Sequence, residues 1–440
     1  MPMPPTTRPR SARTIPSARL GGRTWTSIVL IGLVGQLAWT IENMYLNVFV
    51  YDTITDNPTV LALMVAASAV SATIATMLLG AASDRLGRRR EFIAIGYILW
   101  GLTTAAFGFL SVDGIREIAT VGDAVVLTIL AVILLDCLMS AIGAGANDAA
   151  FNAWVTESTV PSNRGRADSV LAILPLVAML IVFGALDGLT QAGAWREFFI
   201  IIGAATSAVG VIGWFLVRDP ATVQPQPGGY LASVLAGLRL RAVRQNPALY
   251  LTLACLALVG TSTQVFLPYL IIYIQRTLRI DGYAIVLGTV LVTASVISVL
   301  GGRVIDRIGK IRSFPPAVTL LATGLVLMFF ARGMVPVILA GIVMMSGFML
   351  SMAVLSATVR DHTPADRVGS IQGLRMISAI LIPMVAGPFI GAAVIVGAAE
   401  TYVDLGVVKQ VPTAWIFLAA AAVLLIVPLP FRALARRTAA

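Results

Sequence analysis

The sequence is poor in the residues on which most soluble enzymes depend. Its 440 residues include two cysteines, one histidine and 12% charged residues, whereas soluble domains carry about 25% charged residues. Cys137 and Cys255 both lie in apolar stretches, so neither a disulfide framework nor zinc-ligand spacing is available. With His362 as the single histidine, a histidine-based metal cluster or catalytic triad is excluded. We expect no cofactor and no bound metal.

Lysine is scarce as well, since only Lys310 and Lys409 are lysines among 31 basic residues, and the net charge is +10. The chain is 58% hydrophobic with a mean hydropathy of +0.91, above the roughly 45–50% apolar content of soluble domains. Positive charge in a soluble protein suggests nucleic acid, but in a chain this apolar it indicates which side of a membrane each loop faces. We therefore expect a lipid bilayer as partner and no nucleic acid.

Long uncharged stretches recur along the whole chain. A helix that crosses a bilayer needs about 20 mostly apolar residues, and twelve stretches of this order predict an all-α integral membrane protein with two groups of six spans. Few charged residues interrupt them, chiefly Glu42, Asp136, Asp148 and Arg375. The predicted spans are residues 25–50, 60–82, 92–112, 124–150, 169–186, 198–217, 247–275, 282–302, 313–331, 333–359, 368–394 and 410–431.

Basic residues are divided unevenly between the two sides of this arrangement. If both ends lie on one side, the tails and loops of that side hold 24 Lys and Arg residues, against six on the other. Cytoplasmic loops are enriched in these residues, so both termini are predicted to be cytoplasmic. The predicted organisation is a disordered basic tail (1–24), a six-helix bundle (25–217), a linker with an amphipathic helix on the membrane surface (218–246), a second six-helix bundle (247–432) and a tail (433–440).

One loop pattern occurs twice. Residues 80–90 and 302–312 both fit G-x-x-x-D-R-x-G-(R/K)-x-R, 222 residues apart, and each lies between the second and third span of its half. The glycines permit close helix approach and a tight turn, and the basic residues favour the cytoplasmic side. A weaker echo relates residues 161–165 to residues 364–369. The repeat predicts two similar halves in the same orientation.

With this doubled loop, twelve spans and a long central linker, the chain resembles the major facilitator superfamily over nearly all residues beyond 24. The resemblance implies two pseudo-symmetric halves around a cavity lined by the first, fourth, seventh and tenth spans. It also implies that the loop aspartate latches the cytoplasmic side when the cavity opens outward. The alternative is that the basic residues 88–90 only fix the topology. The gating residues implied by the resemblance are Gly80, Asp84, Arg85, Gly87, Arg88, Arg90, Asp306 and Arg307.

Polar side chains inside spans are costly, so they are candidate functional residues. Four amide and hydroxyl residues of the first span fall within about 60° of a helical wheel, and the fourth span repeats this pattern around Asp136. In the second half the match is weaker, although Gln264 lies 222 residues after Glu42. The predicted substrate-binding residues are Gln36, Trp39, Thr40, Asn43, Asn47, Ser140, Asn147 and Gln264.

Glu42 and Asp136 are the candidate ion-coupling residues. A carboxyl group in a nonpolar cavity can take up and release a proton near neutral pH, and sodium would use the same oxygens. The alternative is an acid that only fixes helix packing. Asp148 and Glu157 are interpreted as groups at cytoplasmic helix ends, and Arg375 either pairs with an acid or extends toward the cytoplasm.

The leading hypothesis is a secondary active transporter for a small organic solute, with proton-coupled uptake of a sugar or glycoside favoured because amides and tryptophan suit hydroxyl-rich molecules. Proton-coupled efflux of amphipathic cationic drugs is the alternative, and a non-transporting membrane sensor on the same fold is a third. The sequence contains no nucleotide-binding P-loop, which argues against an ATP-driven pump. It also contains no group of catalytic residues in a loop, which argues against an enzyme. We expect a monomer in the inner membrane of a bacterium. The bacterial source is expected because the preference for arginine over lysine is typical of GC-rich genomes.

Overall fold

The structure, a computed structural model, describes residues 20–118, 122–219, 240–363, 368–404 and 407–438. Within these residues, twelve helices are long and apolar enough to cross a membrane, which confirms the predicted number. Residues 1–19 of the predicted basic tail lie outside the described residues. Residues 220–239, which include most of the predicted amphipathic helix, lie outside them as well. Of the predicted linker, the structure describes residues 218–219 and the segment from residue 240 on.

The first half contains six spans, several of them assembled from consecutive helical segments. The first span runs over Gly22–Thr53 and therefore begins inside the predicted tail. The segments are α1 (Gly22–Thr40), a π-helical segment (Ile41–Tyr45), α2 (Leu46–Thr53), α3 (Pro58–Leu86), α4 (Arg89–Ala106), a 3-10 turn (Phe107–Phe109), α5 (Val112–Ile118), α6 (Ala124–Gly143), a π-helical segment (Ala144–Phe151), α7 (Asn152–Ser158), α8 (Pro161–Ile181), a π-helical segment (Val182–Leu186), α9 (Asp187–Gln191) and α10 (Trp195–Leu216).

The second half repeats this order and adds a β-hairpin before its last span. The segments are α12 (Leu240–Gln245), α13 (Pro247–Phe266), a 3-10 turn (Leu267–Tyr269), α14 (Leu270–Ile272), a π-helical segment (Tyr273–Thr277), α15 (Tyr283–Ile308), α16 (Lys310–Phe330), α17 (Met334–Asp361), α18 (Val368–Met376), a π-helical segment (Ile377–Leu381), α19 (Ile382–Ala398), β1 (Thr401–Asp404), β2 (Val407–Gln410), α20 (Trp415–Leu424) and α21 (Pro428–Thr438).

Local sequence explains where these helices begin and turn. Asn57 and Asn246 cap the helices that begin at Pro58 and Pro247, accepting hydrogen bonds from backbone N–H groups in the first turn. Asparagine at the cap and proline at the first helical position are the preferred pair for a helix start. In both copies of the repeated loop a glycine has positive φ, +65° at Gly87 and +90° at Gly309. The glycines of the motif therefore serve the tight turn that was predicted.

The antiparallel hairpin between β1 and β2 was not predicted. The twelfth span had been placed at residues 410–431, whereas residue 410 ends β2 and the helix begins at Trp415. An apolar stretch with scattered polar residues did not distinguish a strand from the start of a helix. The second predicted tail (433–440) is also helical in part, since α21 continues to Thr438.

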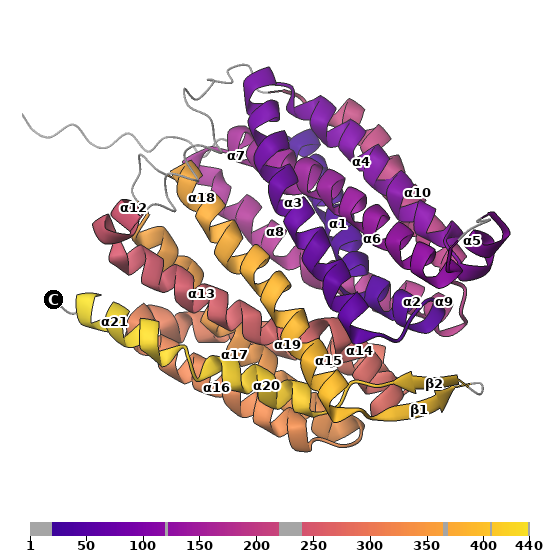
Figure 1. Cartoon of the computed structure of the whole chain (residues 1–440). Helices are drawn as coiled ribbons and strands as arrows, with labels where there is room; N and C mark the ends of the chain where they lie inside the picture. Colours follow the sequence, from indigo (N-terminus) through magenta and orange to yellow (C-terminus); the bar gives the residue numbers. More distant parts are fainter. Residues whose placement is uncertain (1–19, 119–121, 220–239, 364–367, 405–406, 439–440) are drawn as a thin grey trace, which may run out of the picture.

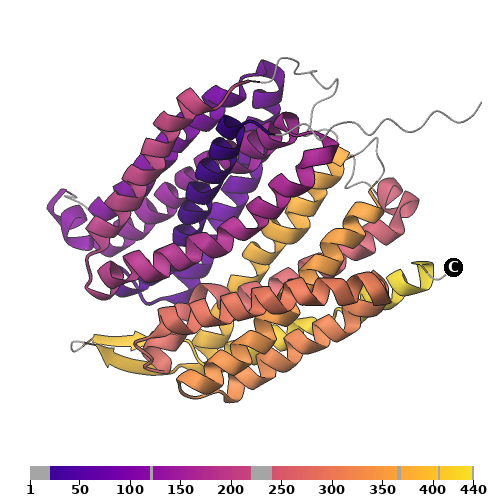
Figure 2. The same ribbon diagram turned by 180° about the vertical axis from the view of Figure 1, so that it is seen from behind.

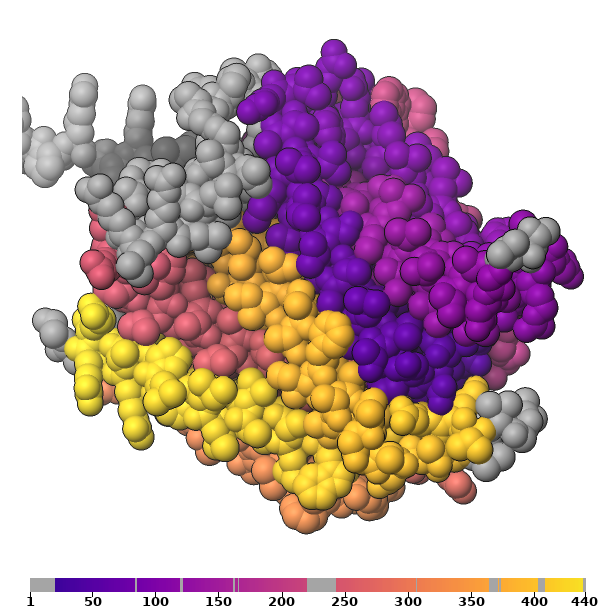
Figure 3. All heavy atoms as spheres, in the orientation of Figure 1, coloured from indigo at the N-terminus to yellow at the C-terminus, as the bar shows by residue number. Residues whose placement is uncertain are grey.

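The two halves form two bundles that lie side by side (Figures 1 and 2). Their main junctions are α3 against α19, and α8 with the following π-helical segment against α15. The surface view shows the indigo α3 against the orange-yellow α19 (Figure 3). We call the end that carries α7, α12, α18 and α21 the terminal end, and the end that carries α2, α5, α9 and the hairpin the hairpin end (Figure 1).

Candidate functional site

The first and fourth spans meet at a buried pair of polar side chains. Ser140 Oγ donates a hydrogen bond to Glu42 Oε1 over 2.5 Å, and Glu42 is only 6% exposed. Asp136 lies one helical turn from Ser140 on the same face, is 1% exposed and interacts electrostatically with Glu42. Glu42 Oε2 and Asp136 Oδ1 are both buried without a hydrogen-bond partner among the described residues. Sequence reasoning thus named two acids that the structure brings together.

Three further polar residues of the first span donate hydrogen bonds within their own helix. Thr40 and Asn43 donate to the carbonyls of Gln36 and Trp39 over 2.8 Å, and Asn47 Nδ2 donates to the Asn43 carbonyl over 3.1 Å. Asn47 is fully buried, and its Oδ1 has no hydrogen-bond partner among the described residues. Gln36, Trp39 and Asn43 are half-buried. These three residues are the ones on this face that a solute could reach.

Asn147 lies in a network that joins three spans of the first half. Its Oδ1 is 2.9 Å from the Tyr97 hydroxyl, which is also 2.9 Å from the Ile31 carbonyl. Its Nδ2 donates to Asp148 Oδ1 over 2.8 Å. Both ends of the Asn147 amide are therefore engaged in helix packing, and its predicted role in substrate binding stays a prediction.

Asp148 was interpreted as a group at a helix end, but it lies inside the fourth span, in the π-helical segment Ala144–Phe151. It accepts hydrogen bonds from Asn147 and from the Trp39 indole and remains half-buried. The π-helical segment of the first span carries Glu42 in the same way. π-helical turns are often found at functional sites, and these two segments are two of the five among the described residues.

Aromatic packing fills the space beside these acids. The Trp39 and Trp100 rings pack edge to face with centroids 5.2 Å apart. A Cβ at Gly143 would lie 2.6 Å from the Trp100 ring, and one at Gly145 would lie 2.2 Å from Leu79. The two glycines thus permit close helix packing.

The second half presents fewer polar groups to the interior. Gln264 is half-buried. A Cβ added at Gly387 would lie 2.5 Å from the Cβ of Gln264, so the seventh and eleventh spans pack closely there. Ser346 of the tenth span is buried, and its Oγ has no partner among the described residues. Arg375 is half-buried near Arg360, and its Nε has no partner among the described residues. The asymmetry predicted from the sequence is present in the described residues.

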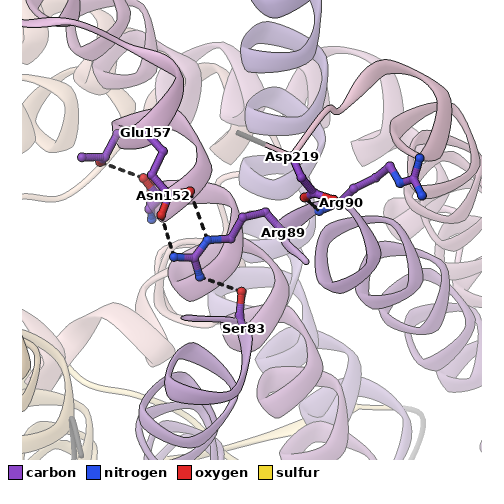
Figure 4. Close-up of polar contacts among 7 residues, drawn as sticks. Ser83, Arg89, Arg90, Asn152, Glu157 and Asp219 are labelled. Carbon is purple, nitrogen blue, oxygen red and sulfur yellow. Dashed lines mark hydrogen bonds and ion pairs between the residues drawn. The ribbon is translucent and has the colours of Figure 1, made fainter. Parts of the chain in front are cut away.

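The repeated loop of the first half is built around a residue that sequence reasoning missed. Arg89, only 3% exposed, contacts Glu157 through Nε at 3.2 Å and Nη2 at 2.7 Å, and donates to Ser83 Oγ over 2.7 Å (Figure 4). It joins the ends of the second and fourth spans at the start of the third. Glu157 is a helix-end group, as interpreted. No local signal in the sequence pairs Arg89 with Glu157, which lies 68 residues away.

The predicted gating residues surround this contact. Arg85 and Arg88 are exposed, and Arg88 pairs with Glu91 at 3.4 Å. The Arg90 backbone N–H donates to Asp219 over 2.8 Å (Figure 4), and its guanidinium lies 4.8 Å from the centroid of the Trp214 ring. A Cβ at Gly80 would lie 3.3 Å from Ala149, so this glycine permits close packing. Arg307 is exposed. The side chains of Asp84 and Asp306 lie outside the described residues, so their gating role stays a prediction.

The sequence matches a known protein family over most of its length. The family model described as Major Facilitator Superfamily matches residues 28–388 and 253–439. The chain belongs to the major facilitator superfamily. A search of curated proteins found no match.

Solved structures of superfamily transporters share the fold. A point mutant of the nucleoside transporter NupG aligns with a TM-score of 0.70 at 15% identity, covering 94% of this chain and 99% of that one. A bacterial homolog of the human lysosomal transporter Spinster, inward-facing and unoccupied, gives 0.69 at 14% identity, covering 94% and 97%. The xylose transporter XylE from E. coli, partially occluded and inward open, gives 0.66 at 15% identity, covering 93% and 97%. The chain is thus a transporter of the superfamily and not an enzyme.

In transporters built from two repeated halves, alternating access is largely a rocking of one half against the other, so we examined the contacts between the halves. At the hairpin end, Arg276 pairs with Asp52 at 2.8 Å. Gln410 closes the same end, because its backbone N–H donates to Asp56 over 2.6 Å and its carbonyl accepts from Tyr51 over 2.5 Å. The unpredicted hairpin therefore joins the second half to the first.

At the terminal end, identified contacts run within one half. Arg89 and Glu157 belong to the first half, while Lys310 pairs with Asp361 at 2.5 Å within the second. Asn246 donates to the His362 carbonyl over 2.8 Å, also within the second half. The bonds between halves that we identify among the described residues thus concentrate toward the hairpin end.

Proposed function

We propose that this transporter moves a small organic solute by alternating access and couples the movement to protons. The observation that carries the proposal is the buried pair Glu42 and Asp136, each with an oxygen that has no partner among the described residues. Two neighbouring buried carboxylates repel each other and are poorly solvated, so one compensating cation favours the pair. A proton is the simplest such cation, and sodium is the alternative that uses the same oxygens.

We propose a sugar or glycoside as the solute. On the predicted polar face of the first span, the half-buried residues are two amides and an indole, Gln36, Asn43 and Trp39. Amides exchange hydrogen bonds with hydroxyl groups, and the indole offers a flat apolar face to a sugar ring. Two transporters with the same fold are named for a nucleoside and for xylose, both of which contain a sugar ring. Those names support the solute class and leave the individual solute open.

Uptake from outside the cell is the proposed direction. The terminal end carries most of the basic residues, which favours placing it in the cytoplasm of a bacterial inner membrane. With bonds between halves at the hairpin end, the arrangement then corresponds to a carrier closed to the outside. A single chain contains both halves, so we propose a monomer. The specific observation favouring the alternative, proton-coupled efflux of lipophilic cations, is the mostly apolar second half facing the acids.

Transport by purified protein in proteoliposomes that enclose a pH-sensitive dye tests the proposal. We expect internal acidification when a sugar or glycoside is added outside, and loss of this signal in Asp136→Asn. Glu197→Gln, which changes an exposed acid at the hairpin end, is the matched control and should keep the signal. Sugar-driven acidification that persists in the double variant Gln36→Leu/Asn43→Leu would overturn the binding-face assignment. Alkalinisation on addition of lipophilic cations would favour efflux, and a signal that requires sodium would replace the proton.

A further inference from the structure

The β-hairpin is fixed to the second half, from which it comes (Figure 1). Strands β1 and β2 pair antiparallel, and the pairing ends at Gln410. Directly beyond it, the Val411 N–H donates to the Glu400 carbonyl over 3.1 Å. Thr277 Oγ1, at the end of the seventh span, donates to the Pro412 carbonyl over 2.6 Å. The hairpin therefore follows the second half when the two halves move.

Gln410 presents its backbone groups to the first half. In an antiparallel pair, residues alternate between bonding to the partner strand and facing away from it. Because Val411 bonds to Glu400, the N–H and C=O of Gln410 face away from β1. The N–H donates to Asp56 Oδ2 over 2.6 Å, and the C=O accepts from the Tyr51 hydroxyl over 2.5 Å. One residue of the hairpin thus carries two bonds between the halves.

Tyr51 contacts both strands of the hairpin. It lies in α2 and is only 2% exposed. Tyr402 of β1 forms a hydrogen bond with the Tyr51 hydroxyl, and the Lys409 ammonium of β2 lies 5.9 Å from the centroid of the Tyr51 ring. The next residue, Asp52, pairs with Arg276 of the second half. The end of the first span is therefore the part of the first half that holds the hairpin.

The bonds to Gln410 exist only while the hairpin end is closed. When the halves separate, water takes the place of Tyr51 and Asp56 on the Gln410 backbone, so both arrangements satisfy these groups. Removal of either side-chain partner affects the closed arrangement alone. There a backbone group of Gln410, which is half-buried, loses its partner where water has restricted access. Such a loss therefore favours the open arrangement.

We infer that the hairpin is a strap that closes the hairpin end of the solute pathway, and that Tyr51 and Asp56 are the residues that hold it. Solute enters or leaves at this end only after both bonds to Gln410 have broken. The strap thus sets the fraction of molecules that are open at this end. This inference rests on the proposed alternating access but requires neither an identified solute nor a coupling ion.

Distances between spin labels on the two halves test the inference. We would replace Cys137 and Cys255 with alanine and label the exposed positions Ala192→Cys and Val335→Cys, in the first and second half. Double electron–electron resonance in nanodiscs, without solute and at one pH, then reports a shorter distance for the closed arrangement and a longer one for the open arrangement. The ratio of the two populations is the open-to-closed ratio.

Variants of the two holding residues should raise this ratio. Asp56→Ala removes an ionised acceptor, so the ratio should rise by at least about tenfold. Tyr51→Phe removes a neutral donor and should raise it by about threefold to tenfold. Asp56→Asn keeps an oxygen that can accept the same bond without the charge, so its ratio should lie between those of the parent and Asp56→Ala.

Three matched controls should keep the ratio of the parent protein. Gln410→Ala retains the backbone groups that form both bonds. Tyr273→Phe removes a buried hydroxyl at the same end that has no hydrogen-bond partner among the described residues. Glu197→Ala removes an exposed acid of the first half at this end.

The outcomes separate the strap from the proposed function. A longer distance that is present in the parent but unchanged in Asp56→Ala and Tyr51→Phe would overturn the inference and leave alternating access intact. Equal rises in Tyr51→Phe and Tyr273→Phe would overturn it too, even if Asp56→Ala did not fold. Absence of the longer distance from every variant would overturn both the strap and the proposed opening at this end. Loss of the signal in the dye assay would leave these distances unaffected.

Discussion

The two copies of the repeated loop turn the chain at equivalent places but attach to their halves by different chemistry. In the first copy the Arg89 side chain is 4% exposed and holds Glu157 and Ser83. In the second copy the residue 222 positions later is Ile311, and the ion pair is formed by Lys310, whose side chain is 36% exposed. The repeat thus preserves the path of the chain, while the buried charge is found in the first half.

The interiors of the two halves also differ in the number of charged side chains that they contain. The first half places Glu42, Asp136 and Asp148 inside two of its spans, whereas the second half offers a half-buried Gln264 and a buried Ser346. The two halves therefore share the path of the chain, whereas the described acidic side chains inside the spans are concentrated in the first half.

Moving the acid between the halves should give the largest effect. Glu42→Gln places glutamine at both positions related by the 222-residue offset of the repeat, and we expect solute-driven proton movement to fall by at least about tenfold because the buried pair loses an acid. Adding Gln264→Glu should not restore it, because the second half has no counterpart of the Ser140 and Asp136 partners among the described residues. The dye assay with the solute identified there measures both. Restoration in the double variant would mean that the two halves are interchangeable.

Removing the loop cations should give an intermediate effect on stability. Arg89→Ala leaves Ser83 and Glu157 without this partner in a mostly buried site, which should cost about 2–3 kcal/mol. Lys310→Ala removes an exposed pair and should cost less than about 0.5 kcal/mol. Thermal unfolding of the purified variants compares the two. Arg89→Lys should fall between them, since an ammonium group cannot reproduce the planar two-point contact. Equal losses for Arg89→Ala and Lys310→Ala would contradict the contrast between the loops.

Much of this architecture could be predicted from the sequence, for definite physical reasons. Twelve spans followed from uncharged length, and the turn glycines followed from the repeated motif, because both signals are local. The pairing of Glu42 with Ser140 was within reach, since Ser140 lay on the polar stripe of the fourth span and Glu42 lay beside that of the first. Arg89 was missed because its importance comes from a partner 68 residues away, which a single sequence does not reveal. The hairpin was missed because its short strands are paired with each other and joined to the other half.

The two turn glycines should show the smallest and most local difference. Gly87 has φ +65° and ψ +20°, a left-handed helical conformation that asparagine also adopts, so Gly87→Asn should cost less than about 1 kcal/mol. Gly309 has φ +90° and ψ +149°, close to a region that glycine alone populates, so Gly309→Asn should cost about 1–2 kcal/mol. A Cβ at Gly309 would meet no atom within 4 Å, so the loss would report backbone strain and not a clash. Thermal unfolding of both variants measures the difference. If the two substitutions proved equally costly, the two turns would share one conformational requirement, and the halves would differ only in the charges placed on a common frame.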